Sequence, residues 1–371
     1  MGEVTPKSIY MSETKAYCVI LAGGKGRRLW PCSREKKPKQ FDDFFGTGRT
    51  QLQQTYDRFS ALLPEDHIYI VTNADYLHLV HEQLPDVGID RIIAEPVHRN
   101  TIPSIAWASF RLLNRDPEAT VIVSPSDQAV MDQQQFVIDI NKALQIAENL
   151  KGLICLGVKP TRPEPGYGYL QQGEQTEEGL FKIKSFAEKP EREFAQIFMD
   201  SGEFYWNTGM FAAKVKFLVD CFNELLPEVL RHHQYQNHFQ TIEEENHYML
   251  ENFPRYPNLS IERGILEPLN HAYVMPCHFG WADLGTWHSI YEAESETAGE
   301  NITLNTEAIF ENAHNNIVKL PKERFAVING LDGFIVAEHN NMLLICPKED
   351  SSALIRKYIN EVQLIKGDEY I

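Results

Sequence analysis

The chain of 371 residues contains no apolar run that approaches the roughly 20 residues needed to cross a bilayer. Residues 1–15 are polar and lack the hydrophobic core of a secretory signal. These two absences predict a cytoplasmic protein that does not associate with membranes. Hydrophobic residues still make up 43% of the chain, which is enough to build a substantial core.

None of the six cysteines stands in the Cys-x-x-Cys spacing that is typical of zinc and redox sites. Several of them lie inside apolar, strand-like runs. We therefore expect buried free thiols in a reducing compartment, and neither disulfides nor a zinc site.

Positive charge is also scarce, because 35 Lys and Arg residues stand against 52 Asp and Glu residues, and the net charge is −17. Such a balance argues against a surface that binds nucleic acid. The segment from Lys25 to Lys39 is an exception, with seven basic residues and one acid, Glu35. A solvated charge run is the common explanation of such a segment. Here the interleaved Gly, Trp and Pro residues and the preceding apolar run favour a site for a polyanion.

The first half of the sequence alternates short apolar runs, rich in Val and Ile, with amphipathic segments. The runs predict five buried strands, at 17–22, 68–72, 91–95, 120–124 and 153–158. The segments between them predict helices over 52–63, 75–84, 102–113 and 134–150. A Thr50–Gln53 capping box begins the first of these helices. This alternation predicts an α/β fold with a doubly wound, mostly parallel sheet, which binds ligands at the carboxyl ends of its strands.

After about residue 300 the pattern changes to short apolar runs separated by Asn, Gly and Asp. Five runs, at 309–310, 316–320, 325–328, 333–337 and 342–346, predict a small β unit that closes with a helix over 351–362. We expect three parts in all: a polar tail over 1–15, a main α/β domain over 16–295 and a β-rich domain over 296–371. The polar stretch 231–248, which contains four histidines, predicts an exposed helix.

The first predicted strand runs directly into a glycine-rich loop. Gly23, Gly24 and Gly26 allow backbone N–H groups to approach phosphate oxygens, because no Cβ stands in the way. Arg28 and Lys39 can add charge-assisted hydrogen bonds. The loop lacks the Gly-Lys-Ser/Thr ending of a Walker loop and the third glycine of a dinucleotide fingerprint. The sequence therefore predicts a phosphate site of another kind.

Eight short motifs extend this prediction along the chain. They are Gly23-Gly-x-Gly-x-Arg-Leu-Trp-Pro-x-Ser-Arg34, Pro38-Lys-Gln-Phe41, Glu95-Pro-x-x-x-Asn-Thr-x-Pro-Ser-Ile105, Pro125-Ser-Asp127, Gly166-Tyr-Gly-Tyr169, Phe186-x-Glu-Lys-Pro190, Trp206-Asn-Thr-Gly-Met-Phe211 and Gly280-Trp-Ala-Asp-Leu-Gly-Thr-Trp287. In this order they resemble the sugar-nucleotide pyrophosphorylase family over about residues 16–360. Trp30 and the Gln40-Phe41 pair resemble its mannose-1-phosphate guanylyltransferase branch. Arg27 and Gln128 depart from the family pattern, which usually has Thr and His there.

The resemblance implies roles for particular residues. Asp127 and Asp283 would bind Mg²⁺ or another divalent cation, which needs only one or two carboxylates beside substrate phosphates. Arg28, Lys39 and Lys189 would act on the phosphates. Nucleotide contacts would come from Leu21, Ala22, Gly23, Gly24, Gly26, Glu95, Asn100 and Ser126. Sugar-phosphate contacts would come from Gly168, Glu188, Lys189 and Asn207. Without the resemblance, a turn would be the favoured interpretation of Asp127 and of Asp283, and Glu188–Lys189 is typical of an exposed ion pair.

The implied reaction joins GTP to α-D-mannose 1-phosphate by direct in-line, metal-assisted attack, and releases diphosphate. The implied fold is a Rossmann-like nucleotidyltransferase domain with a small β-helix-like C-terminal unit. Longer family members carry an isomerase domain of the cupin type, so we expect a monofunctional enzyme here, and a homodimer. Two alternatives stay open: nucleotidyl transfer to another hexose 1-phosphate, and a catalytically silent regulator that binds sugar nucleotides.

Overall fold

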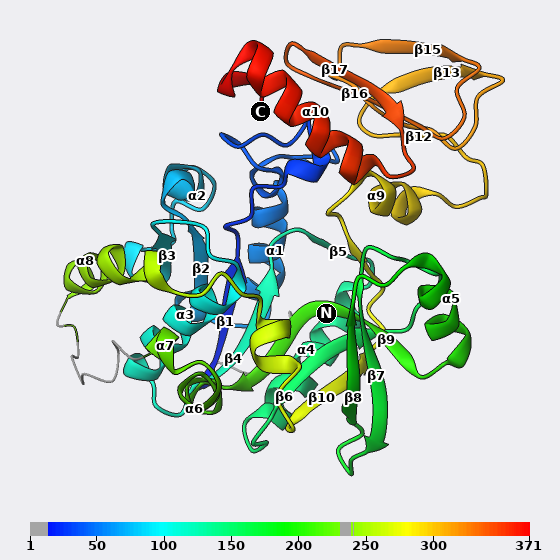
Figure 1. Cartoon of the computed structure of the whole chain (residues 1–371). Coiled ribbons are helices and arrows are strands. Elements are labelled where there is room, and N and C mark those ends of the chain that lie inside the picture. The colour runs from blue at the N-terminus through cyan, green and yellow to red at the C-terminus, as the bar shows by residue number, and fades with distance from the viewer. Residues whose placement is uncertain (1–13, 231–238, 240) are drawn as a thin grey trace, which may run out of the picture. The chain divides into compact units, whose positions relative to one another are not determined.

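The computed structural model describes residues 14–230, 239 and 241–371, which form two compact units assembled from separate segments (Figure 1). Unit 1 comprises residues up to 23, 56–125 and 130–281, and unit 2 comprises 24–55, 126–129 and 282–371. The predicted division at residue 295 and the predicted tail over 1–15 stay predictions. Half of the predicted helix over 231–248, namely 231–238 and 240, lies outside the described residues, and α8 occupies Ile242–Asn252.

A nine-stranded sheet forms the centre of unit 1, in the order β3-β2-β1-β4-β9-β6-β10-β8-β7. Its first four strands are parallel: β3 (Ile92–Glu95), β2 (Ile68–Asn73), β1 (Ala16–Leu21) and β4 (Thr120–Pro125). The others are β9 (Phe204–Lys214), β6 (Leu153–Val158), β10 (Ala272–Cys277), β8 (Phe181–Glu188) and β7 (Gly168–Gln175). Only β6 and β10 pair in parallel among these five. The predicted α/β fold and the five predicted strands are confirmed. The sheet is mixed because β9 runs antiparallel to β4 and β6, and β8 runs antiparallel to β10 and β7.

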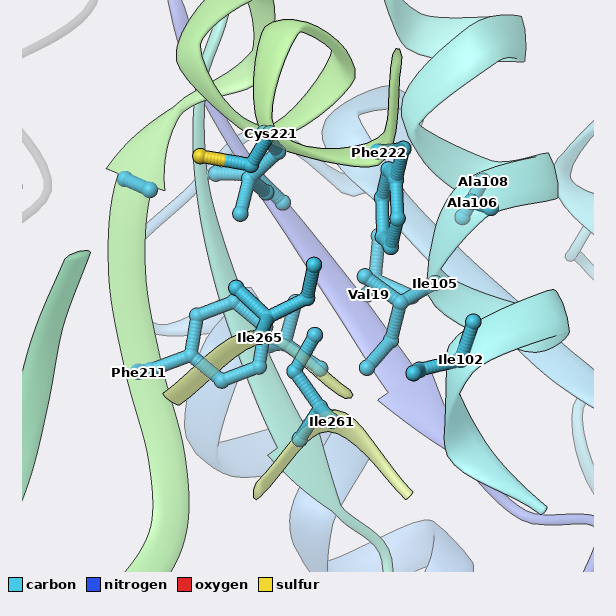
Figure 2. Packing of buried hydrophobic residues seen from close by; sticks show 14 of the residues in the cluster. Val19, Ile102, Ile105, Ala106, Ala108, Phe211, Cys221, Phe222, Ile261 and Ile265 are labelled. Carbon is cyan, nitrogen blue, oxygen red and sulfur yellow. The ribbon is translucent and has the colours of Figure 1, made fainter. Parts of the chain in front are cut away.

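Helices pack on both faces of this sheet, because successive strand residues point to opposite sides. Tyr17 and Val19 of β1 join one buried cluster with α3 (Thr101–Arg115) and α6 (Val215–Leu225). Figure 2 shows this cluster around Val19, Phe211 and Phe222. Cys18 and Ile20 are fully buried on the opposite face. There Phe59 of α1 (Gln51–Ser60) lies 5.6 Å from Phe136 of α4 (Gln133–Ala147), measured between ring centroids.

The capping box predicted at the start of α1 is present. The Thr50 N–H donates to Gln53 Oε1 over 3.0 Å, and the Gln53 N–H donates to Thr50 Oγ1 over 3.3 Å. Two backbone donors that the first helical turn would leave unpaired are thereby satisfied. The other α-helices described in unit 1 are α2 (Leu77–Gln83), α5 (Arg192–Ser201), α7 (Pro227–Leu230) and α8.

Unit 2 contains two small sheets. In the first, β12 (Ile302–Thr303), β14 (Ile317–Lys319) and β16 (Phe334–His339) are parallel, and β17 (Met342–Pro347) pairs antiparallel with β16. In the second, β13 (Glu307–Glu311) runs parallel to β15 (Phe325–Asn329). The five predicted runs all form strands, and the final helix is α10 (Ser351–Lys366). A β-helix-like winding stays a prediction.

The core of unit 2 joins residues that are distant in the sequence. Leu29 and Trp30 are buried in one cluster with Trp287, at the start of α9 (Trp287–Glu294), and with Ile355 of α10. Trp30 Nε1 donates to the Tyr370 carbonyl oxygen over 2.7 Å, and Trp287 Nε1 donates to the Trp30 carbonyl oxygen over 3.3 Å. The basic segment is therefore anchored in this core at Leu29 and Trp30.

All six cysteines lie within the described residues and are buried free thiols, as predicted. Within the part of the chain that the structure describes, no helix is both long and apolar enough to span a bilayer.

Candidate active site

The glycine-rich loop turns sharply at Gly26, which has a φ of 62°. A Cβ at this residue would lie 2.5 Å from Ser33 Oγ, so both the backbone conformation and the space require glycine. Ser33 Oγ accepts a hydrogen bond from the Lys39 N–H over 3.0 Å. Gln40 Nε2 donates to the Gly24 carbonyl oxygen over 2.7 Å. The 33–40 segment of unit 2 therefore braces the loop at two points.

The cations on either side of Gly26 share one acidic partner. Lys25 Nζ lies 3.3 Å from Glu35 Oε1, and the Arg27 guanidinium is also paired with this carboxylate. Arg27, which stands where the family usually has Thr, is thus engaged by the one acid of the basic segment. The sequence did not single out Glu35 as part of the site, although its isolation among seven basic residues was a usable signal.

Two cations and two carboxylates that the sequence marked as site residues come together in unit 2. Lys39 is only 5% exposed, and its Nζ lies 2.6 Å from Asp127 Oδ2 and 3.1 Å from the Leu284 carbonyl oxygen. Arg28 and Asp283 lie beside Gly285, the residue after Leu284. A Cβ at Gly285 would lie within 2.9 Å of both an Asp283 carboxylate oxygen and an Arg28 guanidinium nitrogen. The neighbouring Ser126 is buried, and its carbonyl oxygen accepts from Thr55 Oγ1 over 3.2 Å.

Asp127 and Asp283 supply hard carboxylate oxygens, the donor type that Mg²⁺ prefers. Across residues 14–230, 239 and 241–371, no group of three or more His, Cys, Asp or Glu side chains is arranged to hold a metal ion. Two carboxylates suit a cation that completes its shell with substrate phosphates and water. The residues present therefore fit Mg²⁺ that binds together with a nucleotide.

In unit 1, the residues predicted to contact the nucleotide gather around Glu95, the last residue of β3. Its side chain is 3% exposed, and burial raises the pKa of the carboxyl group to about 7, opposed by a hydrogen bond from Ser104 Oγ. A Cβ at Gly23 would lie 3.3 Å from Glu95 Oε2, so the loop backbone passes close to this carboxyl group. Leu21 ends β1, and the Ala22 N–H donates to the Val71 carbonyl oxygen over 2.7 Å.

Asn100 is linked to Glu95 through Ser104. It caps α3 from a backbone conformation with a positive φ of 62°, and its side chain accepts from the Thr101 N–H over 3.0 Å. Its carbonyl oxygen accepts from Ser104 Oγ over 3.0 Å. A non-glycine residue in this conformation is uncommon and is often held at functional sites. Ser104 was not predicted as a site residue, although it lies inside the motif that begins at Glu95.

The sugar-phosphate residues predicted in unit 1 lie side by side on three adjacent strands. Gly168 of β7 is directly opposite Glu188 of β8 and directly opposite Asn207 of β9. Lys189 follows in a left-handed conformation with a φ of 47°, its N–H donates to the Tyr167 carbonyl oxygen over 3.2 Å, and its ammonium group pairs with Glu188. The side chains of Lys189 and Glu188 are 53% and 31% exposed, so both can meet a solute.

Aromatic side chains surround this part of unit 1. The Tyr167 ring lies 5.1 Å from Trp206 and 4.9 Å from Trp281, centroid to centroid, in edge-to-face contacts. Both tryptophans and Trp287 of unit 2 are buried, as expected for packing residues.

Comparison with known proteins decides the family. The family model described as nucleotidyl transferase matches residues 17–300. The chain belongs to the nucleotidyl transferase family. This nucleotidyl transferase is 32% identical to a mannose-1-phosphate guanylyltransferase of Salmonella typhimurium, over 95% of this chain and 73% of the relative. It is 31% identical to the mannose-1-phosphate guanylyltransferase of Escherichia coli K12, over 89% of this chain and 72% of the relative.

A solved structure gives the same result for the fold of the nucleotidyl transferase. A crystal structure described as mannose-1-phosphate geranyltransferase from Thermus thermophilus superposes with a TM-score of 0.84 at 26% identity, and covers 94% of this chain and 100% of that one. The family resemblance predicted from the ordered motifs is therefore confirmed. The protein is an enzyme of the nucleotidyltransferase class.

Proposed function

We propose that the enzyme is a mannose-1-phosphate guanylyltransferase, which converts GTP and α-D-mannose 1-phosphate into GDP-mannose and diphosphate. The grouping of Arg28, Lys39, Asp127 and Asp283 in unit 2 carries the proposal. This charge pattern suits a polyphosphate with a divalent cation, and relatives about 30% identical to this chain bear the proposed name.

In the proposed reaction, a phosphate oxygen of the sugar 1-phosphate attacks the α-phosphorus of GTP. The bond from the α-phosphorus to the oxygen that bridges it to the β-phosphate breaks, and diphosphate leaves with the electron pair. Arg28 and Lys39 bind phosphate oxygens and stabilise the charge that moves onto the leaving diphosphate. Asp127 and Asp283 would hold Mg²⁺, which would supply Lewis-acid chemistry and neutralise phosphate charge.

The attacking phosphate needs no base, because a phosphomonoester is largely dianionic at neutral pH. Orientation and charge neutralisation are therefore what the residues of the protein contribute. The backbone N–H groups of Gly23, Gly24 and Gly26 bind phosphate oxygens. Contacts to the nucleoside come from Leu21, Ala22, Glu95, Asn100 and Ser126. Lys189 binds the sugar phosphate, and Gly168, Glu188 and Asn207 bind sugar hydroxyl groups.

The test is diphosphate release by the purified protein with Mg²⁺, over a grid of four nucleoside triphosphates and several hexose 1-phosphates. We expect release with GTP and mannose 1-phosphate. Preference for another pair would keep the chemistry and replace the proposed substrates. Absence of release with every pair, from folded protein, would overturn the proposal and favour the silent regulator.

We further propose that two copies of the chain associate through the β strands of unit 2. Five large apolar side chains there are between 53% and 71% exposed: Ile309, Phe325, Val327, Leu343 and Ile345. The last four line a groove of about 650 Å³. Apolar patches of this kind usually mark interaction surfaces. A sedimentation mass equal to one chain would rule out the homodimer.

We also propose the cytoplasm as the location of the protein, because six buried free thiols suit a reducing compartment.

A further inference from the structure

Ser104 is a buried residue of α3 to which the proposed reaction gives no role. Its side chain is 6% exposed, and its hydroxyl group contacts two acceptors. Ser104 Oγ donates to Glu95 Oε1, and it lies 3.0 Å from the carbonyl oxygen of Asn100. A bond from a helical serine to the carbonyl oxygen four residues earlier is common in helices. The bond to Glu95 reaches a different element, β3, so the helix alone does not explain it.

The start of α3 is fixed, which leaves the Ser104 hydroxyl group little freedom to move. The Ile102 N–H donates to the Leu259 carbonyl oxygen over 3.1 Å, and Thr101 Oγ1 accepts from the Ile261 N–H over 2.8 Å. Ile102 and Ile105, on either side of Ser104 in the sequence, are buried in the core cluster that Figure 2 shows. Ser104 therefore presents its hydroxyl group to Glu95 from a rigid support.

The two oxygens of the Glu95 carboxyl group face different neighbours. Oε1 accepts from Ser104, and a Cβ at Gly23 would lie 3.3 Å from Oε2. Among the residues that the structure describes, no other side chain donates a hydrogen bond to Glu95. The bond from Ser104 lowers the pKa of Glu95 against the larger effect of burial, and so favours the ionised carboxylate. Ser104 thus sets which oxygen of Glu95 faces the glycine-rich loop.

We propose that Ser104 is a positioning residue for the nucleotide, which acts by fixing the Glu95 carboxyl group beside the glycine-rich loop. This inference rests on the proposed function, in which Glu95 and the backbone of Gly23 contact GTP. Without the Ser104 hydroxyl group, Glu95 Oε1 is buried and has lost its donor. A buried acceptor that has lost its partner is costly, so the carboxyl group turns away from the position in which it meets the nucleotide.

The test compares Ser104→Ala with wild type in steady-state assays, in which GTP and mannose 1-phosphate are varied in turn. Loss of the hydroxyl group should raise the KM for GTP about tenfold, the range expected when a hydrogen bond to a charged group is lost. The KM for mannose 1-phosphate and kcat should stay within about twofold of the wild-type values. A variant that is merely less stable would lose active enzyme, and therefore kcat, at unchanged KM values.

Ser109→Ala is the matched control, because Ser109 is a buried serine of the same helix outside the candidate site, and it should leave both KM values unchanged. An unchanged KM for GTP in Ser104→Ala would overturn the inference, and so would an equal rise of both KM values. If Ser104→Ala does not fold, Ser104→Cys takes its place, because a thiol is of similar size and is a weak donor. It should give the same selective rise, and wild-type constants would again overturn the inference.

A second comparison shows whether Ser104 acts through Glu95. Glu95→Ala removes the carboxyl group, so in that background Ser104→Ala should change the KM for GTP by less than about twofold. Additive effects of the two substitutions would show that Ser104 acts without Glu95, and would overturn the inference.

Failure of the proposed function would be visible separately, in the wild-type protein. If wild type uses another nucleoside triphosphate, the comparison is made with that nucleotide. If wild type turns over no pair, calorimetric binding of GTP to wild type and Ser104→Ala takes the place of the assay, and equal affinities would overturn the role of Ser104 alone. Wild type that binds none of the four triphosphates would overturn both the function and the inference.

Discussion

The ammonium group of Lys39 lies 2.6 Å from the carboxylate of Asp127, and only 6% of the Lys39 side chain is exposed. Lys39 also donates to the carbonyl oxygen of Leu284, the residue after Asp283. The buried ammonium group of Lys39 therefore contacts both segments of unit 2 that carry a candidate metal ligand, Asp127 and Asp283. In the proposed reaction, this contact keeps Lys39 and the carboxylates in place before the phosphates and the cation bind.

Asp127→Asn should lower kcat/KM for diphosphate release by at least about 100-fold, because Lewis-acid stabilisation is worth several kcal/mol. The side chain keeps its shape and an acceptor for Lys39, so the circular dichroism spectrum should be unchanged. Asp66→Asn, at an exposed acid paired with Arg115, is the control and should retain wild-type rates. Wild-type activity of Asp127→Asn, at any Mg²⁺ concentration, would remove Asp127 from the reaction.

The adjacent residues Arg27 and Arg28 should differ sharply in importance. Arg28→Ala should cost at least about 100-fold in kcat/KM, the usual loss when one donor to a developing oxyanion is removed. Arg27→Thr should cost less than about fivefold, because Arg27 is paired with Glu35 in an exposed contact, and such pairs are worth roughly 1 kcal/mol or less. Initial rates at varied GTP would measure both, and equal losses would contradict the assignment.

Glu95 should make stability depend on pH. The pKa of Glu95 is raised from 4.5 to about 7 in the folded protein. Ionisation of this carboxyl group therefore opposes folding once the pH exceeds its pKa in the unfolded chain. The free energy of unfolding should therefore fall as the pH rises from about 4.5 to about 7, by up to about 3 kcal/mol. Glu95→Gln should be more stable than wild type at pH 8 and similar to it at pH 4.5. Urea titrations at both pH values, with Glu177→Gln as an exposed control, would show whether this difference exists.

Gly264→Ala should destabilise the protein by about 1–3 kcal/mol, because the added methyl group overlaps Ile102 Cδ1. Ile102→Val removes that atom, so in the Gly264→Ala background it should restore part of the lost stability. On its own, Ile102→Val should cost about 1 kcal/mol. Thermal unfolding of wild type, the two single variants and the double variant would form a double-mutant cycle that measures this coupling. Strictly additive effects would show that the two residues are not in steric contact.

Val327→Glu should convert the proposed homodimer into a monomer, because a carboxylate would be buried without a partner. Val327 is 71% exposed within one chain, so the melting temperature of the isolated chain should change little. Leu364→Glu, on α10 and 88% exposed, is the control and should sediment as wild type does. A dimer that survives Val327→Glu would place the interface elsewhere.

Local sequence pattern was sufficient for most of the secondary structure. The runs of Val and Ile locate β1, β2, β3, β4 and β6 to within one or two residues, because buried parallel strands require apolar side chains on both faces. The helix predicted over 102–113 is α3, Thr101–Arg115, which Asn100 caps. Strand direction has no such local signal. The sheet was predicted to be mostly parallel, and the antiparallel course of β9 could not be read from Phe204–Lys214.

Neighbour relations within the candidate site depend on register and on long-range packing. Nothing local indicates that Gly168 stands opposite both Glu188 and Asn207; that follows from the pairing of three strands. The motif order marked these residues and the Lys39–Asp127 pair without giving their contacts.

The composition of unit 2 from residues 24–55, 126–129 and 282–371 has a consequence for the order in which the protein matures. On the ribosome, the segments of unit 1 are complete once residue 281 has emerged. At that moment Trp30 still lacks Trp287, Ile355 and the carbonyl oxygen of Tyr370, which surround it in the finished protein. Lys39 likewise lacks Leu284. During synthesis, the basic segment of residues 25–39 is therefore anchored only after the chain has been extended past unit 1 and Leu284, Trp287, Ile355 and Tyr370 have been added.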